Sequence, residues 1–186
     1  MSSPLLQQIM EANREFVAKH ARLDAEPVSK YPKRNLAVVT CMDTRLLDFL
    51  EPALGLSRGE AKLIKVAGST AFGDFDAVIG SLMVAVYELH VHDILVVGHE
   101  DCGMLATTAD SLCARMQERG VAEAAIAAVR PKLKAWADPI GNVEESVRTT
   151  VGQLRENPYL PKDINVYGAV IHPHTGELVL LNEDQL

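Results

Sequence analysis

The sequence predicts a single α/β domain with a mainly parallel central sheet, made of four parallel strands plus an antiparallel edge strand and flanked by helices. Short apolar runs rich in β-branched residues alternate along the chain with longer segments that carry apolar residues at helical spacing. Such alternation is typical of right-handed βαβ crossovers. The 186 residues are 48% hydrophobic and 23% charged, which is enough to bury one core, and no repeat or long linker divides them.

The first expected element is a helix that opens at Ser3-Pro4, because proline suits the first helical turn. Its apolar positions recur at helical spacing and are Leu5, Leu6, Ile9, Met10, Phe16 and Val17. This stripe has to cover a surface, which is either the helix's own sheet or a second subunit. Residues 21–34 include two prolines and predict an irregular connection to the first strand.

Two strands and two helical segments follow in the first half of the chain. The apolar runs at residues 35–40 and 62–66 predict the strands. The segment between them looks helical, and we expect Pro52 to interrupt it. Asp76 is a suitable cap for a helix over residues 78–89. That helix is almost wholly apolar, so we expect it to be buried.

The second half of the chain continues the alternation. An alanine-rich helix is expected at residues 122–137, and Asn142 with Glu145 resembles a capping pair for a further helix that ends at Asn157-Pro158. The strands expected in this half span residues 93–98, 165–171 and 177–181, the last of them antiparallel at the sheet edge.

Two short polar stretches each begin where a strand ends. The first ligand turn, Cys41-Met42-Asp43-Thr44-Arg45, follows the first strand, and the second ligand turn, His99-Glu100-Asp101-Cys102-Gly103, follows the third. If these strands are neighbours, their carboxyl ends lie side by side, because parallel strands pair about 4.8 Å apart. Side chains from the two turns then converge where open α/β sheets bind ligands.

The ligand turns carry a set of side chains that suits zinc. Cys41, His99 and Cys102 supply two thiols and an imidazole. Three protein ligands leave one position open for water, which is the arrangement of a catalytic zinc. The competing interpretation is a redox disulfide between Cys41 and Cys102, but neither lies in a Cys-x-x-Cys motif and His99 would then have no role.

Charge and cysteine content restrict the possible partners and the compartment. A net charge of -7 argues against nucleic acid or an anionic membrane as a partner. No apolar stretch approaches the roughly 18 residues that a spanning helix needs. Three cysteines cannot all pair in disulfides, which is typical of a reducing compartment, and we expect a cytoplasmic protein. Cys113 is expected to be an inert, partly buried thiol.

The remaining polar candidates have simpler interpretations than catalysis. The four histidines outside the ligand turns, His90, His92, His172 and His174, are expected to be solvated rather than to bind a metal. Asp101 suits a turn or capping role better than that of an acid catalyst. Asp43 and Arg45 are either part of the reactive centre or a structural ion pair at a strand end.

The two ligand turns at this separation resemble those of the β-class carbonic anhydrases, in particular the compact bacterial branch of that family. The similarity runs from about residue 37 to residue 104, including Ala67-Gly68, and continues in the final strands. It implies that Cys41, His99 and Cys102 bind one Zn²⁺ per subunit and that Asp43 and Arg45 form the catalytic pair beside it. It also implies an α/β fold that forms a tight homodimer, or a tetramer, with active sites near the interface.

The function that the resemblance implies is the reversible hydration of carbon dioxide to bicarbonate and a proton. Many family members carry a substrate-binding glutamine where this chain reads Ser81-Leu82-Met83-Val84, which offers no amide. Two alternatives therefore stay open, a hydrolase of carbon disulfide or carbonyl sulfide on the same scaffold and an inactive zinc-bearing interaction protein. Residues 1–34 are expected to form an N-terminal helical arm of the domain whose zinc-binding α/β part spans residues 35–186.

Overall fold

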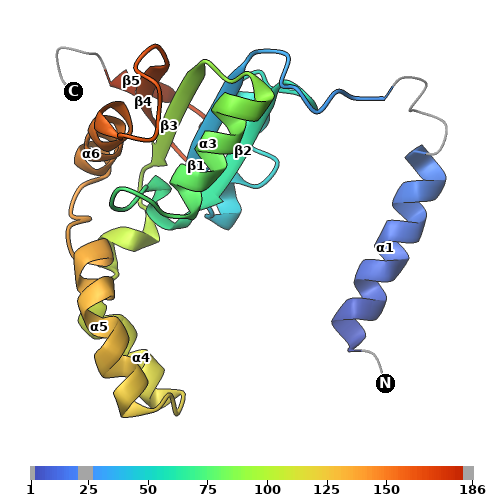
Figure 1. The fold of residues 1–186 in the computed structure, drawn as a ribbon. Helices are drawn as coiled ribbons and strands as arrows, with labels where there is room; N and C mark the ends of the chain where they lie inside the picture. The colour runs from blue at the N-terminus through green and yellow to red at the C-terminus, as the bar shows by residue number, and fades with distance from the viewer. Residues whose placement is uncertain (1–2, 21–26, 182–186) are drawn as a thin grey trace.

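The centre of the computed structural model, which describes residues 3–20 and 27–181, is a five-stranded sheet (Figure 1). The strands are β1 (Leu36–Cys41), β2 (Ala61–Val66), β3 (Asp93–His99), β4 (Asn165–Ile171) and β5 (Leu178–Leu181). Their order is β2-β1-β3-β4-β5, with all neighbouring pairs parallel except β4 and β5. The predicted fold class, the adjacency of β1 and β3, and the antiparallel edge strand are confirmed.

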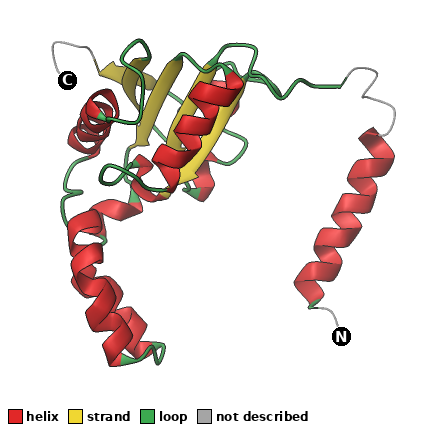
Figure 2. Ribbon diagram, in the orientation of Figure 1, coloured by secondary structure: helices red, strands yellow, loops and turns green. Residues whose placement is uncertain are grey.

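Helices connect the strands and flank the sheet (Figure 2). The α-helices are α1 (Pro4–His20), α2 (Leu50–Ala53), α3 (Ala77–Leu89), α4 (Ala109–Glu118), α5 (Glu123–Ala137) and α6 (Val143–Glu156). Three short 3₁₀ turns also occur, η1 (Thr44–Leu46), η2 (Ala67–Ser69) and η3 (Gly103–Ala106). Within the described ranges no helix is long and apolar enough to cross a membrane.

The two faces of the sheet are buried against different partners, because side chains alternate along each strand. Val39 and Val96 belong to a core that α3 and α6 complete. Val38 and Val97 belong to a second core on the other face, with Leu46 and other residues of η1 and α2. The second core also contains Cys41 and Cys102, so it reaches the ligand turns at the carboxyl ends of β1 and β3.

Helix α3 begins as the sequence predicts but is not buried all round. The Asp76 carboxylate accepts a hydrogen bond from the Ile79 backbone N–H at 2.8 Å. The side chains that face the sheet are buried and comprise Val78, Ile79, Leu82 and Ala85. Val84 and Tyr87 are 53% and 55% exposed. The expectation of a fully buried helix is therefore wrong for this chain alone, since a helix on a sheet hides only one stripe.

Helix α6 lies close against β3 and β4 because both strands carry a glycine beneath it. A Cβ atom at Gly98 would lie 2.7 Å from Val147, and one at Gly168 would lie 2.9 Å from the same valine. Any larger residue at these positions would push the helix away. The helix begins at the predicted cap, where the Asn142 side chain accepts a hydrogen bond from the Glu145 N–H at 3.0 Å.

Pro52 lies inside α2 and does not interrupt it, which corrects the sequence-based expectation. The helix is four residues long, and Pro52 falls in its first turn. Backbone N–H groups of the first turn have no partner within a helix, so proline loses nothing there.

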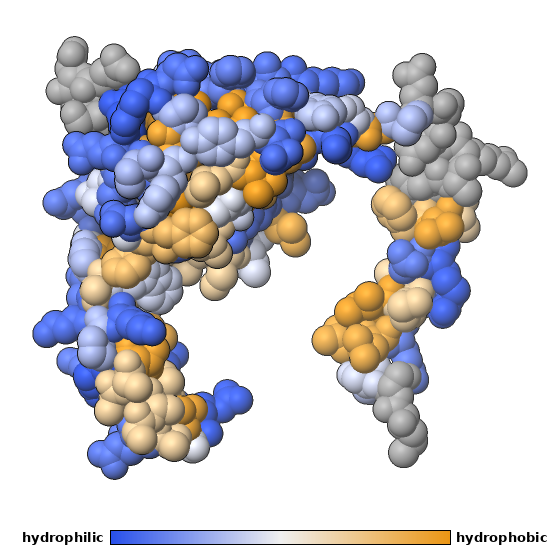
Figure 3. Space-filling model, in the orientation of Figure 1, coloured by the Kyte–Doolittle hydropathy of each residue, from blue (hydrophilic) through white to orange (hydrophobic). Residues whose placement is uncertain are grey.

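Two parts of the chain project from the body in Figure 1: α1 and the hairpin of α4 and α5. Every residue from Ser3 to Lys19 is exposed, and orange apolar patches mark α1 in Figure 3. In contrast, α4 and α5 pack against each other and bury Cys113 and Ile126. The Asp138 carboxylate fixes the base of the hairpin by accepting a hydrogen bond from the Ala109 N–H at 2.8 Å.

Candidate metal centre

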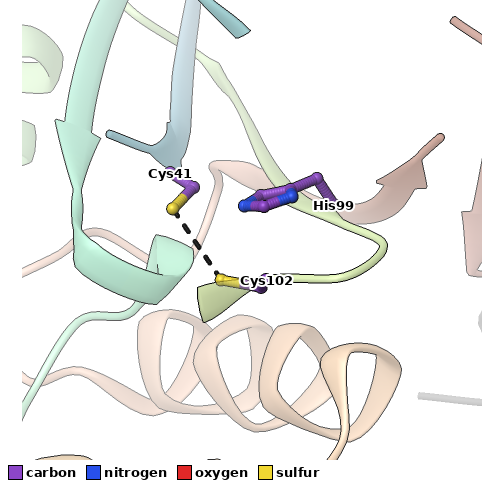
Figure 4. Close-up of side chains that lie close together, drawn as sticks. All are labelled: Cys41, His99 and Cys102. Atoms are coloured by element: carbon purple, nitrogen blue, oxygen red, sulfur yellow. Dashed lines mark hydrogen bonds between the residues drawn. The ribbon is translucent and has the colours of Figure 1, made fainter. Parts of the chain in front are cut away.

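The first and second ligand turns meet at the carboxyl ends of β1 and β3. Cys41 is the last residue of β1, His99 is the last residue of β3, and Cys102 lies in the turn that follows. The two sulfurs and the imidazole point toward one another in Figure 4, and their ligand atoms all lie within 4.8 Å of each other. All three side chains are buried. The structure thus brings together the three residues that the sequence selects as ligands.

The spacing of the two sulfurs fits a shared tetrahedral metal ion. The Sγ atoms of Cys41 and Cys102 lie 3.9 Å apart. Two thiolates bound to one tetrahedral zinc at about 2.3 Å each would lie about 3.8 Å apart. The sulfurs are not bonded to each other, and all three cysteines are free thiols.

His99 presents a ring nitrogen that has no partner. Its Nδ1 lies 2.9 Å from the Glu100 carbonyl oxygen, which fixes the proton on Nδ1 and leaves the lone pair on Nε2. That Nε2 atom is buried and has no hydrogen bond. A buried lone pair without a donor is costly, and a metal ion at the centre of the three ligand atoms would satisfy it.

The charges of the site also favour a bound cation. The adjacent Cys102 thiol is the main cause that lowers the pKa of Cys41, to about 4. The resulting Cys41 thiolate in turn raises the pKa of Cys102 well above its usual range. Burial would lower the pKa of His99, but the Cys41 sulfur and the Glu100 carbonyl outweigh it and raise that pKa. Both thiols can ionise together only with positive charge between them, as zinc provides.

Backbone groups near the two sulfurs favour their thiolate forms. Hydrogen bonds from the backbone of Gly68 and Asp43 lower the pKa of Cys41, and one from Met104 lowers the pKa of Cys102. Gly68 has a φ of +73°, and a Cβ there would lie 3.3 Å from both Met104 and Ile140. Only glycine suits this left-handed, tightly packed position, so its N–H can approach Cys41.

Asp43 and Arg45 form a bidentate pair at the edge of the site. Arg45 Nε donates to Asp43 Oδ1 at 3.0 Å, and Arg45 Nη2 donates to Oδ2 at 2.9 Å. The guanidinium is the main cause that lowers the pKa of Asp43 to about 2. Asp43 Oδ2 lies 3.7 Å from the unpartnered Nε2 of His99. An ionised carboxylate therefore borders the space between the three candidate ligand atoms.

Asp101 has a role that local sequence reasoning missed. Arg45 Nη1 donates to the Asp101 carboxylate at 2.9 Å, and Arg45 Nη2 donates to the Asp101 carbonyl at 2.8 Å. Arg45 therefore joins the two ligand turns and is held from both sides. The only sequence signal is an acidic residue in the opposite ligand turn, 56 positions away.

The thiols border a cleft of about 360 Å³. It is lined by Cys41, Met42, Asp43, Thr44, Ala67, Cys102, Gly103, Met104 and Thr107. The two methionines and Ala67 give it apolar walls, while Asp43 supplies a charged acceptor. Ser81, in the stretch compared with the family's glutamine, does not line this cleft; its hydroxyl donates to the Ala77 carbonyl within α3.

The polar residues predicted to be uninvolved lie elsewhere. His90, His92 and His174 are exposed, and His172 accepts hydrogen bonds at Nδ1 from the backbone N–H groups of His174 and Thr175. Cys113 is buried in the α4–α5 hairpin. In the described part of the chain, Cys41, His99 and Cys102 are the only such cluster of metal-ligating side chains.

A family model described as carbonic anhydrase matches residues 36–178, which include β1 to β4 and the first residue of β5. The chain belongs to the β-carbonic anhydrase family. This confirms the resemblance inferred from the ligand turns.

Individual family members match over most of their length. The crystal structure of β-carbonic anhydrase isoform I from Trichomonas vaginalis superposes with a TM-score of 0.91 at 39% identity, covering 97% of each chain. Beta-carbonic anhydrase 1 of Mycobacterium tuberculosis is 31% identical over 82% of this chain and 85% of its own. A carbon disulfide hydrolase of Acidithiobacillus thiooxidans is 28% identical over 78% of this chain and 76% of its own.

Proposed function

We propose that the protein catalyses the zinc-dependent, reversible hydration of carbon dioxide to bicarbonate and a proton. The observation that carries this proposal is the convergence of two thiols and an unpartnered imidazole Nε2 beside an ionised carboxylate. Membership of the β-carbonic anhydrase family supports it. Cys41, His99 and Cys102 would hold one zinc ion, which when bound supplies a Lewis acid that lowers the pKa of water from about 16 toward 7.

Asp43 and Arg45 would act on the reacting water. The Asp43 carboxylate can accept a hydrogen from water near His99 Nε2 and so orient an oxygen lone pair toward carbon dioxide. Arg45 holds that carboxylate through two parallel hydrogen bonds and is itself held by Asp101. The arginine thus keeps Asp43 ionised and directed away from the metal position, for which a carboxylate could compete.

The cleft suits a small linear substrate. Its walls at Met42, Ala67 and Met104 are apolar, as an uncharged gas requires. The proton released by the reaction leaves the site through the open mouth of the cleft to buffer. No side chain in the lining other than Asp43 and the two thiols titrates.

Stopped-flow hydration of carbon dioxide across pH 6 to 9, on protein of measured zinc content, tests the proposal. We expect activity that is proportional to bound zinc and is abolished by a chelator. The Cys113→Ser variant is the matched control, because it removes a buried thiol outside the site. A zinc-loaded protein without hydration at any pH would support the inactive interaction protein instead.

The second candidate function is hydrolysis of carbon disulfide or carbonyl sulfide. It is favoured by the similarity to carbon disulfide hydrolases at 26–29% identity. Both sulfur compounds are linear molecules that the same activated water could attack. Turnover of each gas by the same zinc-loaded preparation separates the candidates, since the preferred substrate has the larger kcat/KM.

We also propose a homodimer, or a tetramer built from such dimers, in which α1 of one subunit covers an apolar surface of the other. The apolar positions of α1 are 52% to 62% exposed in the single chain. A helix of this length gains little stability alone, so its apolar face needs a second surface. In this proposal residues 1–34 remain an arm of the α/β domain, and the reduced cysteines suit a cytoplasmic location.

A further inference from the structure

One backbone carbonyl beside the metal centre receives two buried hydroxyl groups. Thr40 Oγ1 donates to the Val97 carbonyl oxygen at 3.0 Å, and Ser69 Oγ donates to the same oxygen at 2.8 Å. Thr40 and Val97 are fully buried, and Ser69 is 1% exposed. A carbonyl oxygen has two lone pairs, so it can accept both bonds. We call this arrangement of Thr40, Ser69 and Val97 the hydroxyl clamp.

The hydroxyl clamp joins three elements that each reach the metal centre. Thr40 immediately precedes Cys41 on β1, and Val97 lies two residues before His99 on β3. Thr40 and Val97 are register partners in the sheet. Ser69 follows Gly68 in η2, a turn that contacts β1. The clamp therefore fixes the relative positions of the carboxyl ends of β1 and β3, which carry Cys41 and His99. It also fixes the position of η2 beside them.

Neither hydroxyl is explained by packing alone. Thr40 follows Ala37, Val38 and Val39 in a fully buried strand, where a valine of nearly the same shape would avoid burying a hydroxyl. Ser69 has a φ of +60°, a left-handed conformation that is unfavourable for any residue with a Cβ. Such strain persists only where the surrounding structure holds it, and the buried bond to Val97 is one contact that does so.

We propose that Thr40 and Ser69 are positioning residues for the metal ligands, acting through the Val97 carbonyl. The inference rests on the proposed zinc site. The clamp aligns the Cys41 end of β1 with the His99 end of β3, and it ties η2 to the same position through Ser69. Outer residues that orient metal ligands typically change metal affinity by about 10- to 100-fold when they are removed.

The test compares zinc release from four variants of the full-length protein. Thr40→Val and Ser69→Ala each remove one hydroxyl, and Thr40→Ser restores it without the methyl group. Thr150→Val is the matched control, because Thr150 is 1% exposed but lies on α6 outside the clamp. Zinc transfer to a coloured chelator gives the release rate, and the thiolate-to-cobalt absorption of the cobalt-substituted protein reports ligand geometry.

We expect Thr40→Val and Ser69→Ala to release zinc about 10- to 100-fold faster and to shift the cobalt bands. Thr40→Ser and Thr150→Val should behave like the unmodified protein in both measurements. A fifth variant combines Thr40→Val with Ser69→Ala. Its zinc release should be accelerated by less than the product of the two single accelerations, because both hydroxyls act on one carbonyl. Metal-free samples of all variants are compared by thermal unfolding, which separates a general loss of stability from an altered site.

Unchanged zinc release and cobalt absorption in both Thr40→Val and Ser69→Ala would overturn the inference. The inference would also be overturned if zinc release were accelerated as much in Thr40→Ser, or in Thr150→Val, as in Thr40→Val. Failure of the zinc assignment itself is recognised separately, since the unmodified protein would then contain no stoichiometric zinc.

Discussion

The three candidate metal ligands, Cys41, His99 and Cys102, and the apolar side chains of α1 lie at opposite extremes of burial in the same chain. In the ligand turns, His99 is 1% exposed, and hydrogen bonds of 2.8 to 3.0 Å join Arg45 to both Asp43 and Asp101. In α1, Leu6 and Ile9 are 55% and 52% exposed although they are apolar. One region is complete within a single chain, whereas the other presents an apolar stripe that the chain itself does not cover.

This difference separates two requirements of the molecule. The proposed metal centre needs only the sheet, the two ligand turns and η2, all of which one chain supplies. Burial of α1 needs another surface. Metal binding and subunit association should therefore respond to different substitutions, and the following variants test that separation from the largest expected effect to the smallest.

Removing a thiol ligand should have the largest effect. Cys41→Ser and Cys102→Ser are each expected to lose nearly all bound zinc, because a serine hydroxyl stays protonated where a thiol ionises. Elemental analysis after dialysis measures the zinc content, with Cys113→Ser as the control that should keep it. Near-stoichiometric zinc in either ligand variant would contradict the assignment.

Removing the guanidinium should separate activity from metal binding. Arg45→Ala is expected to keep zinc but to lose activity by about 100-fold or more, because nothing then orients Asp43 or holds it off the metal. Asp101→Asn retains an acceptor for Arg45 and leaves the Asp43 to Arg45 pair intact. Its hydration rate per bound zinc should therefore fall only a few-fold. Stopped-flow rates per bound zinc measure both, and equal losses in the two variants would show that Arg45 acts in another way.

Charges on the apolar stripe of α1 should affect association alone. Leu6→Glu combined with Ile9→Glu is expected to weaken dimerisation by at least about 100-fold, because an interface would have to bury two unpaired carboxylates. Gln8→Glu adds charge away from the stripe and is the control. Sedimentation measures the mass and elemental analysis the zinc content. A wild-type monomer at micromolar concentration would contradict the proposed dimer. Loss of zinc in the variant that no longer dimerises would show that metal binding depends on association.

The pH dependence of activity should be the most gradual effect. Two thiolate ligands offset the charge of zinc, so water should be acidified less than by three neutral histidines, and activity should rise toward alkaline pH. The rise is at most about tenfold per pH unit for one ionisation. Arg45 lowers the pKa of Asp43 to about 2, so the carboxylate stays charged throughout pH 6 to 9 and cannot cause the rise. A flat stopped-flow profile would contradict the expectation.

The sequence predicts what depends on neighbouring residues and misses what depends on distant ones. The ligand turns were recognisable because each follows an apolar strand directly, and Asp76 and Asn142 cap their helices through residues three positions on. The role of Asp101 was missed because Arg45 is remote in sequence. The hydroxyl clamp gives no signal at all, since its acceptor is a backbone carbonyl that any residue would carry at position 97.

The sequence also predicts faces less well than it predicts elements. The apolar run of α3 marks a helix correctly but does not reveal that Val84 and Tyr87 point away from the sheet. Likewise, the sequence marks α1 and α5 as helices without indicating what either of them contacts, and it gives no separate prediction for α4. Helical spacing specifies which residues share a stripe, whereas the surface that covers the stripe is a property of the assembled molecule.

Because α1 precedes every strand of the sheet, it leaves the ribosome before any of the folded body exists. Its apolar stripe has no folded body to contact while the five strands are being synthesised. The stripe is still exposed in the single chain after the body has folded. During this interval the helix is open to chaperones and to other newly made chains. Neighbouring ribosomes on one messenger RNA would raise the local concentration of such chains, which speeds both pairing and aggregation through this stripe.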